Sequence, residues 1–143
     1  MMAMIEAENL TKRFGTKVAV NDVSFTIGAG DVVGFLGPNG AGKSTTMRLL
    51  TGFLDADSGV ARLHGDDVRS ARRAAQSQIG YLPEAAGGFP NLTVREFLVF
   101  CGESRGLRGG SMDDAISRTS DLISLDSALD SAMKSLSKGW RQR

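Results

Sequence analysis

The sequence predicts an α/β fold built around a glycine-rich loop, and three observations support this prediction. An apolar run at residues 32–36 leads into the loop, and a helical pattern follows it. The run lacks polar alternation, which favours a strand buried on both faces in a parallel sheet. Residues 18–27, in contrast, end in alternating apolar and polar positions, which is typical of a half-exposed antiparallel strand. We therefore expect a partial parallel core and an antiparallel β part.

The loop matches the phosphate-binding pattern G-x-x-x-x-G-K-[ST]. Glycines let successive backbone N–H groups turn toward phosphate oxygens, and the N-terminus of the following helix adds partial positive charge. The lysine can reach the terminal phosphates, and the Ser44 hydroxyl can bind a magnesium ion. The predicted phosphate site consists of Gly37, Pro38, Asn39, Gly40, Ala41, Gly42, Lys43, Ser44 and Thr45.

Composition excludes several classes of protein. The 143 residues suit one domain of ordinary size or part of a larger protein, and a net charge of +1 gives no reason to expect nucleic acid as a partner. The single cysteine, Cys101, rules out an intrachain disulfide and suits a reducing cytoplasm. No signal peptide or membrane-spanning run is visible, so we expect any role at a membrane to depend on a partner.

The remaining elements are expected to follow in order along the chain. Strands are predicted at residues 4–10, 60–63 and 79–82, the last one buried, and helices at 44–54 and 70–76. Thr93 and Glu96 have the form of a capping box, which predicts a helix from there to about Ser104. Cys101 lies on the apolar stripe of that helix, so we expect it to be a core residue rather than a reactive thiol. Ser111 is expected to start a further helix.

These motifs together resemble the ATP-binding subunit of ABC transporters, and the resemblance runs from end to end of the chain. The specific element is LSKGWRQR at residues 136–143, which is similar to the family's Leu-Ser-Gly-Gly-Gln signature and the basic-Gln-Arg run after it. Phe14 lies where the family places an aromatic residue against adenine. Residues 79–84 lie where it places a magnesium-coupled lid loop.

The resemblance implies ATP and Mg²⁺ as cofactors, with Ser44 and Glu84 near the metal. Phe14 would stack on adenine, although an ordinary core aromatic is the alternative. Ser137 and Gly139 would contact the ATP of a second subunit in a head-to-tail dimer.

The resemblance also implies an organisation and a location. Residues 1–83 would form the β subdomain and loop core, 84–135 the helical subdomain that meets a permease, and 136–143 the signature. Through that permease the protein would lie on the cytoplasmic, inner face of a membrane.

Three departures from the family pattern are visible. Glu84 stands where Gln is most common, and its carboxylate can still coordinate magnesium or orient water. Lys138 and Trp140 replace Gly and Gln in the signature. This combination resembles the branch of ABC-2-type exporters and gliding-motility-type transporters. Trp140 is either a plain anchor to the core or a residue near the dimer interface.

In the family, a strand ending in Asp, a catalytic Glu and a switch His follow the signature. The 143 residues contain none of these after it, so we expect an N-terminal portion with weak or no hydrolysis of its own. The missing strand would pair beside residues 32–36, so the isolated chain should be marginally stable or prone to aggregate.

Two hypotheses stay open. The first is an ATP-binding subunit that, in the complete protein, hydrolyses ATP to power export. The second is a non-catalytic nucleotide-binding fragment or regulatory module. A GTPase or nucleotide kinase is disfavoured because no Asn-Lys-x-Asp motif occurs and because the signature at residues 136–143 argues against both.

Overall fold

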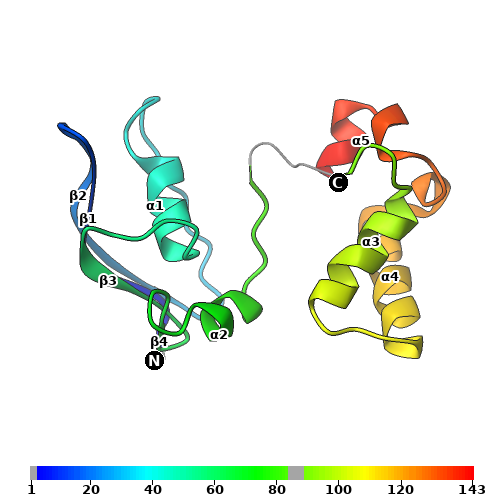
Figure 1. Cartoon of the computed structure of the whole chain (residues 1–143), viewed down its shortest axis with the longest axis horizontal. Helices are drawn as coiled ribbons and strands as arrows, with labels where there is room; N and C mark the ends of the chain where they lie inside the picture. The colour runs from blue at the N-terminus through cyan, green and yellow to red at the C-terminus, as the bar shows by residue number, and fades with distance from the viewer. Residues whose placement is uncertain (1–2, 84–88) are drawn as a thin grey trace. The chain divides into compact units, whose positions relative to one another are not determined.

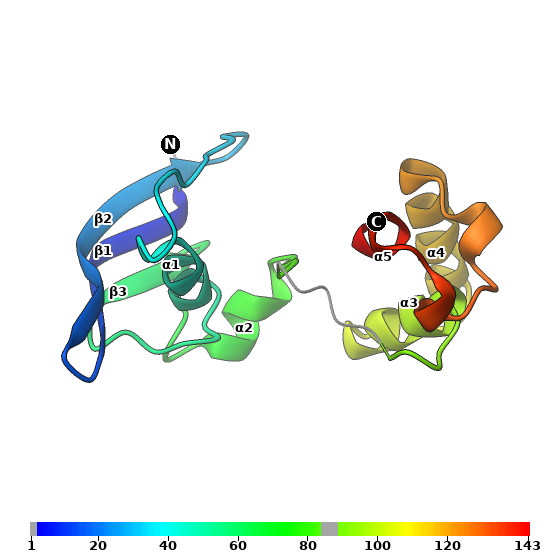
Figure 2. The same ribbon diagram turned by 90° about the horizontal axis from the view of Figure 1, so that it is seen from above.

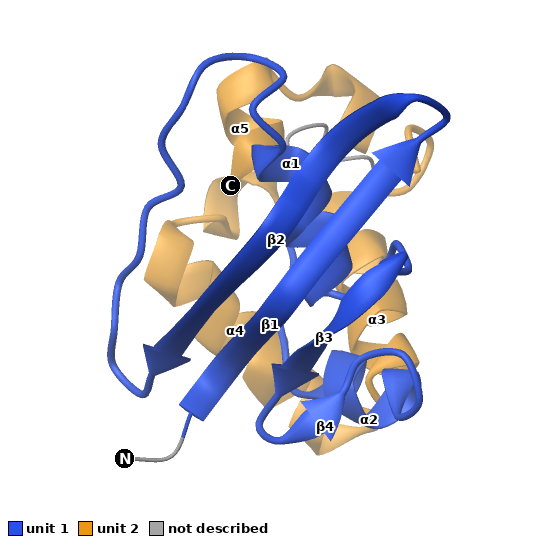
Figure 3. Cartoon of the chain, turned by 90° about the vertical axis from the view of Figure 1, so that its left-hand side faces the viewer, with its two compact units in different colours: residues 1–81 blue, residues 82–143 orange. Residues whose placement is uncertain are grey.

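The computed structural model describes residues 3–83 and 89–143, which belong to two compact units, Met1–Tyr81 and Leu82–Arg143 (Figure 3). The elements of the first unit are β1 (Ala3–Phe14), β2 (Lys17–Gly28), α1 (Lys43–Leu50), β3 (Ser58–Leu63), β4 (Asp66–Asp67) and α2 (Arg72–Ser77) (Figure 1). Those of the second are α3 (Val94–Ser104), α4 (Gly110–Ile123), two 3₁₀ turns (Asp126–Ala128 and Met133–Ser135) and α5 (Lys138–Gln142). No helix in the described ranges is long and apolar enough to cross a membrane.

The first unit is a four-stranded antiparallel sheet with α1 against one face (Figures 2 and 3). Its strand order is β2-β1-β3-β4, and β1 is paired on both sides. Leu10 of β1, Leu49 of α1 and Leu63 of β3 are fully buried where the helix meets the sheet. Burial of these apolar side chains holds the helix that follows the glycine-rich loop in place.

The two predicted parallel strands are not formed. Residues 32–36 and 79–82 have no regular structure, and Val32 and Leu36 are 100% and 95% exposed. Phe35 alone of that run packs inward, edge-on to Phe25 with 5.4 Å between ring centroids. A strand needs a hydrogen-bonded neighbour for its N–H and C=O groups, and every strand of the described sheet pairs antiparallel. The prediction of strands at residues 32–36 and 79–82, which rested on their apolar composition, was therefore wrong.

The predicted capping box of the second unit is confirmed. The Thr93 hydroxyl accepts the Glu96 N–H at 3.2 Å, and the Glu96 carboxylate accepts the Thr93 N–H at 2.7 Å. The bond from the Thr93 N–H lowers the pKa of Glu96 most, and the Thr93 hydroxyl, which donates to the same carboxylate oxygen at 3.0 Å, lowers it further. The helix that they start, α3, ends at Ser104 as predicted.

Two other expectations for the second unit need adjustment. The helix predicted from Ser111 begins one residue earlier, at Gly110. Cys101 on α3 is only partly buried and lies outside the core cluster around Val94 and Ile116. Burial nevertheless raises the pKa of its thiol, so little reactive thiolate forms at neutral pH.

Candidate functional site

The glycine-rich loop ends at the start of α1, where backbone N–H groups are open to an anion. Gly42 precedes the helix with φ 88°, and its carbonyl accepts the Thr46 N–H at 2.8 Å. No side chain caps this helix start, and its first turn contains no acidic residue. The first N–H groups of a helix have no intrahelical acceptor, and they carry the positive end of the helix dipole. This geometry suits a phosphate group.

Gly42 also brings the loop into direct contact with β2. A Cβ atom at this position would lie 2.2 Å from the carbonyl oxygen of Ala19 and 3.4 Å from Cγ2 of Val20. No side chain fits at such a distance. Gly40, with a similar φ of 85°, has open space around it instead. The loop is therefore anchored at Gly42 and unobstructed near its tip.

Lys43 places its ammonium group on the loop itself. Its Nζ donates hydrogen bonds to the carbonyl oxygens of Gly37 at 2.6 Å and Pro38 at 2.8 Å. An ammonium group has three N–H donors, so one remains for a further acceptor. The two bonds keep a positive charge beside the open helix start, where a terminal phosphate would need it.

Ser44 offers an oxygen ligand next to this charge. Its hydroxyl makes no hydrogen bond to any residue in the described ranges, so the oxygen is available. No three His, Cys, Asp or Glu side chains of the described chain gather to hold a metal by themselves. Mg²⁺ commonly takes one or two protein ligands and fills its sphere with phosphate oxygens and water, so Ser44 fits that ion. The other predicted metal ligand, Glu84, lies outside the described residues.

Phe14 ends β1 at the tip of the β1–β2 hairpin, and the residue is 51% exposed, so it is not a core aromatic. The hairpin tip and the start of α1 lie toward the same end of the first unit (Figures 1 and 3). Strand register explains why: Lys12 pairs with Val20, which follows Ala19 and lies with it beside Gly42. The structure thus brings Phe14 and the phosphate loop to one region.

Sequence reasoning missed a polar cluster behind Phe14. The Lys12 ammonium lies 2.8 Å from an Asp57 carboxylate oxygen and 5.8 Å from the centroid of the Phe14 ring. The other Asp57 oxygen accepts the Arg13 N–H at 2.7 Å. One signal was present, since residues 12 and 14 share a strand face. Asp57 is too distant in sequence for any local pattern to pair it with Lys12.

Ser137 and Gly139 lie in the second unit, at the start of α5. Ser137 Oγ accepts the Trp140 N–H at 3.3 Å, and both Ser137 and Gly139 are exposed. Trp140 packs against the core of this unit, and the Arg143 guanidinium lies 5.0 Å from its ring centroid. These contacts favour the anchor interpretation of Trp140.

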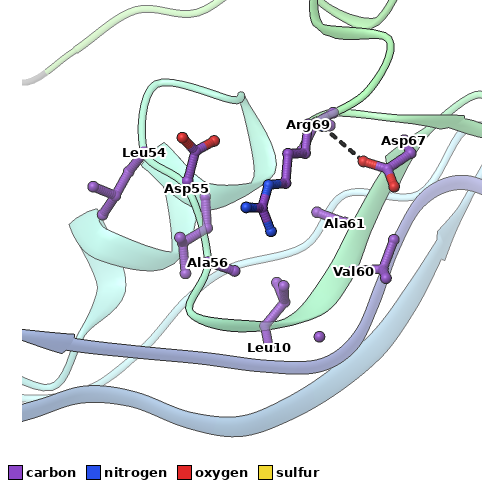
Figure 4. Close-up of a pocket in the computed structure, with 11 residues that line it drawn as sticks. Leu10, Leu54, Asp55, Ala56, Val60, Ala61, Asp67 and Arg69 are labelled. Atoms are coloured by element: carbon purple, nitrogen blue, oxygen red, sulfur yellow. Dashed lines mark hydrogen bonds between the residues drawn. The ribbon is translucent and has the colours of Figure 1, made fainter.

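Two hollows of the first unit contain none of the predicted site residues. One, of about 260 Å³, is lined mostly by apolar side chains, including Phe35 and Ile79 from the segments that form no strand. The other, of about 110 Å³, has Leu10 at its base and the Arg69 side chain pointing into it (Figure 4). There the Asp67 carboxylate accepts the Arg69 N–H at 2.7 Å.

The chain matches a family described as "ABC transporter" over residues 20–143. It is 39% identical over 140 residues to the probable multidrug ABC transporter ATP-binding protein YbhF of Escherichia coli, covering 98% of this chain and 24% of that protein. It is 37% identical to the Nod factor export ATP-binding protein I of Burkholderia lata, covering 99% and 47%. The chain therefore spans less than half the length of these curated relatives.

Solved structures give the same result. A structure described as the ATP binding subunit of an ABC transporter superposes with a TM-score of 0.87 at 26% identity, over 97% of this chain and 58% of that one. A second, cbiO1 from Clostridium perfringens, has a TM-score of 0.84 at 20% identity, which is a likeness of fold.

Proposed function

The chain belongs to the ABC transporter family, and from this premise we propose that it binds ATP as the nucleotide-binding part of a subunit that powers export. Its relatives include proteins named for multidrug and Nod factor export. Because the chain covers only part of their length, hydrolysis and transport by the whole protein belong to the proposal.

The observation that carries the proposal is the open start of α1 with the Lys43 ammonium beside it. Loop residues 37–45 would surround the phosphate chain with backbone N–H groups, and Lys43 would donate its third N–H to a phosphate oxygen. The Ser44 hydroxyl would hold Mg²⁺, with Glu84 as the second candidate ligand. When bound, that ion neutralises phosphate charge and orients the phosphates.

The proposed base contact is Phe14. Its exposed ring lies at the loop's end of the first unit, and a nucleobase could stack on it. An aromatic face accepts any base, so this contact adds affinity without selecting adenine by itself.

We further propose that the subunit acts with two partners. Ser137 and Gly139, exposed at the start of α5, would face the ATP of a second ATP-binding subunit. A permease would hold the pair at the inner face of the membrane and would contact the helical part, about residues 84–135. The matched cbiO1 structure is described as part of the ABC transporter complex cbiONQ.

The test is a calorimetric titration of the chain with ATP and Mg²⁺. Lys43→Ala removes a charged donor and should weaken binding about 10- to 100-fold, the range expected for hydrogen bonds to charged groups. Arg118→Ala is the matched control, because Arg118 is an exposed cation on α4 and the change also removes one positive charge. Equal ATP affinity in the wild type and Lys43→Ala would overturn the proposal.

The same protein should show weak or no ATP turnover by itself. Steady-state release of phosphate that disappears in Lys43→Ala would contradict this expectation, and it would also argue against a non-catalytic module.

A further inference from the structure

We propose that Asp57 and Lys12 are positioning residues that hold the Phe14 ring as a platform for a nucleobase. This inference rests on the proposed ATP-binding function. It concerns how the protein would bind the nucleobase, whereas the phosphate loop would bind the phosphates at the other end of the nucleotide.

Lys12 is unusually covered for a lysine. Its side chain is only 14% exposed, and its ammonium contacts the Asp57 carboxylate at 2.8 Å on one side and lies 5.8 Å from the Phe14 ring centroid on the other. Lysine is rarely covered to this extent unless its charge is paired. Both the carboxylate and the negative face of an aromatic ring favour the cation. Asp57 therefore holds the Lys12 ammonium in place, and the ammonium in turn holds the Phe14 ring.

Asp57 holds the end of β1 through three separate bonds. Its carboxylate oxygens bind the Lys12 ammonium and accept the Arg13 N–H at 2.7 Å, and its own N–H donates to the Thr11 carbonyl at 3.0 Å. The β1–β3 ladder ends at the Thr11–Ser58 pair, so these bonds continue the connection past the last ladder pair. Phe14 follows immediately, and its backbone direction is set by the residues held this way.

Phe14 remains partly open to solvent although Lys12 lies near its ring. The Lys12 ammonium lies over the ring within cation–π distance, yet about half of the residue, 51%, remains exposed at the hairpin tip. Beside this tip, Gly42 brings the phosphate loop against Ala19 of β2. A nucleotide with its phosphates at α1 thus has an aromatic surface within the same end of the unit. A ring that is already held in one orientation loses less conformational entropy when a base stacks on it, so it binds the base more tightly.

The experiment compares two ligands, ATP and inorganic tripolyphosphate, by calorimetry on the full chain with Mg²⁺. Tripolyphosphate reports on the loop alone, and the ratio of the two affinities reports on the base. Asp57→Asn keeps the shape of the side chain and removes its charge, and Lys12→Met keeps the length and removes the cation. Asp121→Asn, at an exposed position on α4, is the control for loss of one negative charge.

We expect Asp57→Asn and Lys12→Met to lower ATP affinity roughly fivefold or more, the lower part of the range for losing a base–aromatic contact, and to leave tripolyphosphate affinity unchanged. Asp57→Asn should have no further effect when Phe14 is already Ala, because it acts through that ring. Asp57→Glu keeps the negative charge, so its ratio of ATP affinity to tripolyphosphate affinity should lie between that of Asp57→Asn and that of the wild type.

The outcomes separate this inference from the proposed function. If the wild type binds neither ligand, the proposed function fails, and this inference fails with it. If both ligands bind and Asp57→Asn weakens them equally, Asp57 only supports the fold, and the inference is overturned. The same holds if the affinity ratio is unchanged in Asp57→Asn, or if its effect persists in full beside Phe14→Ala.

Discussion

Replacing Gly42 by alanine tests whether the phosphate loop is anchored by its contact with β2. The added Cβ would lie 2.2 Å from the carbonyl oxygen of Ala19, a distance that requires the backbone to move. Gly40→Ala is the matched control, because Gly40 has nearly the same φ, 85° against 88°, and nothing near its missing side chain. Both variants therefore carry the cost of a left-handed backbone at alanine, and only Gly42→Ala adds a steric clash with the Ala19 carbonyl oxygen.

The magnitudes follow from these two contributions. A left-handed backbone conformation costs a non-glycine residue about 1–2 kcal/mol. Overpacking against a fixed neighbour typically adds about 1–3 kcal/mol, and only Gly42→Ala incurs it. With a denaturant slope of about 1–3 kcal/mol per molar urea, the unfolding midpoint of Gly42→Ala should lie roughly 1 M below that of Gly40→Ala.

The assay is urea unfolding of the wild type and both variants, followed by far-UV circular dichroism, with ATP titrations alongside. We expect Gly42→Ala to lose both stability and ATP affinity, because the loop shifts away from β2 and carries the helix start with it. Coincident urea midpoints for Gly42→Ala and Gly40→Ala would refute the reasoning, since the contact with Ala19 would then carry no energy.

The remaining predictions concern the capping box and the exposed apolar run. Thr93→Ala should lower the unfolding free energy of the second unit by about 1 kcal/mol, measured by urea denaturation. Because the capping box lowers the pKa of Glu96, its contribution is complete above the ordinary value of 4.5 and is lost as the pH falls through the lower folded value, so the wild-type advantage over Thr93→Ala should shrink in acid. Leu36→Asp, at a residue that is 95% exposed, should change the free energy of unfolding by less than about 0.5 kcal/mol while reducing light scattering from aggregates. A soluble wild-type monomer that melts cooperatively and reversibly would contradict the expected aggregation.

Local patterns were sufficient for several parts of the molecule. Thr93 and Glu96 stand three residues apart, and the capping box they form needs nothing beyond its own helix. The loop before Lys43 and the helix after it were likewise readable, because glycine spacing and helical periodicity are short-range properties. The structural likeness to ATP-binding subunits of ABC transporters confirms the fold class that these motifs predicted.

The apolar run at residues 32–36 shows where such patterns fail. Its composition is that of a buried strand, yet Val32 is fully exposed and the run pairs with nothing in the described sheet. Apolar composition indicates which segments favour burial. Whether a segment is buried depends on a neighbouring segment that supplies hydrogen bonds and apolar contacts.

By itself, the sequence determined the capped start of α3 and the family, since both depend on residues close together in the chain. Only the tertiary structure showed that Phe14 is not a core aromatic, because exposure is a property of what packs nearby. It alone joined Lys12 to Asp57, whose charges are paired by the fold across 45 positions of sequence. Contacts between distant residues arise from strand register and turn geometry, which no local pattern specifies.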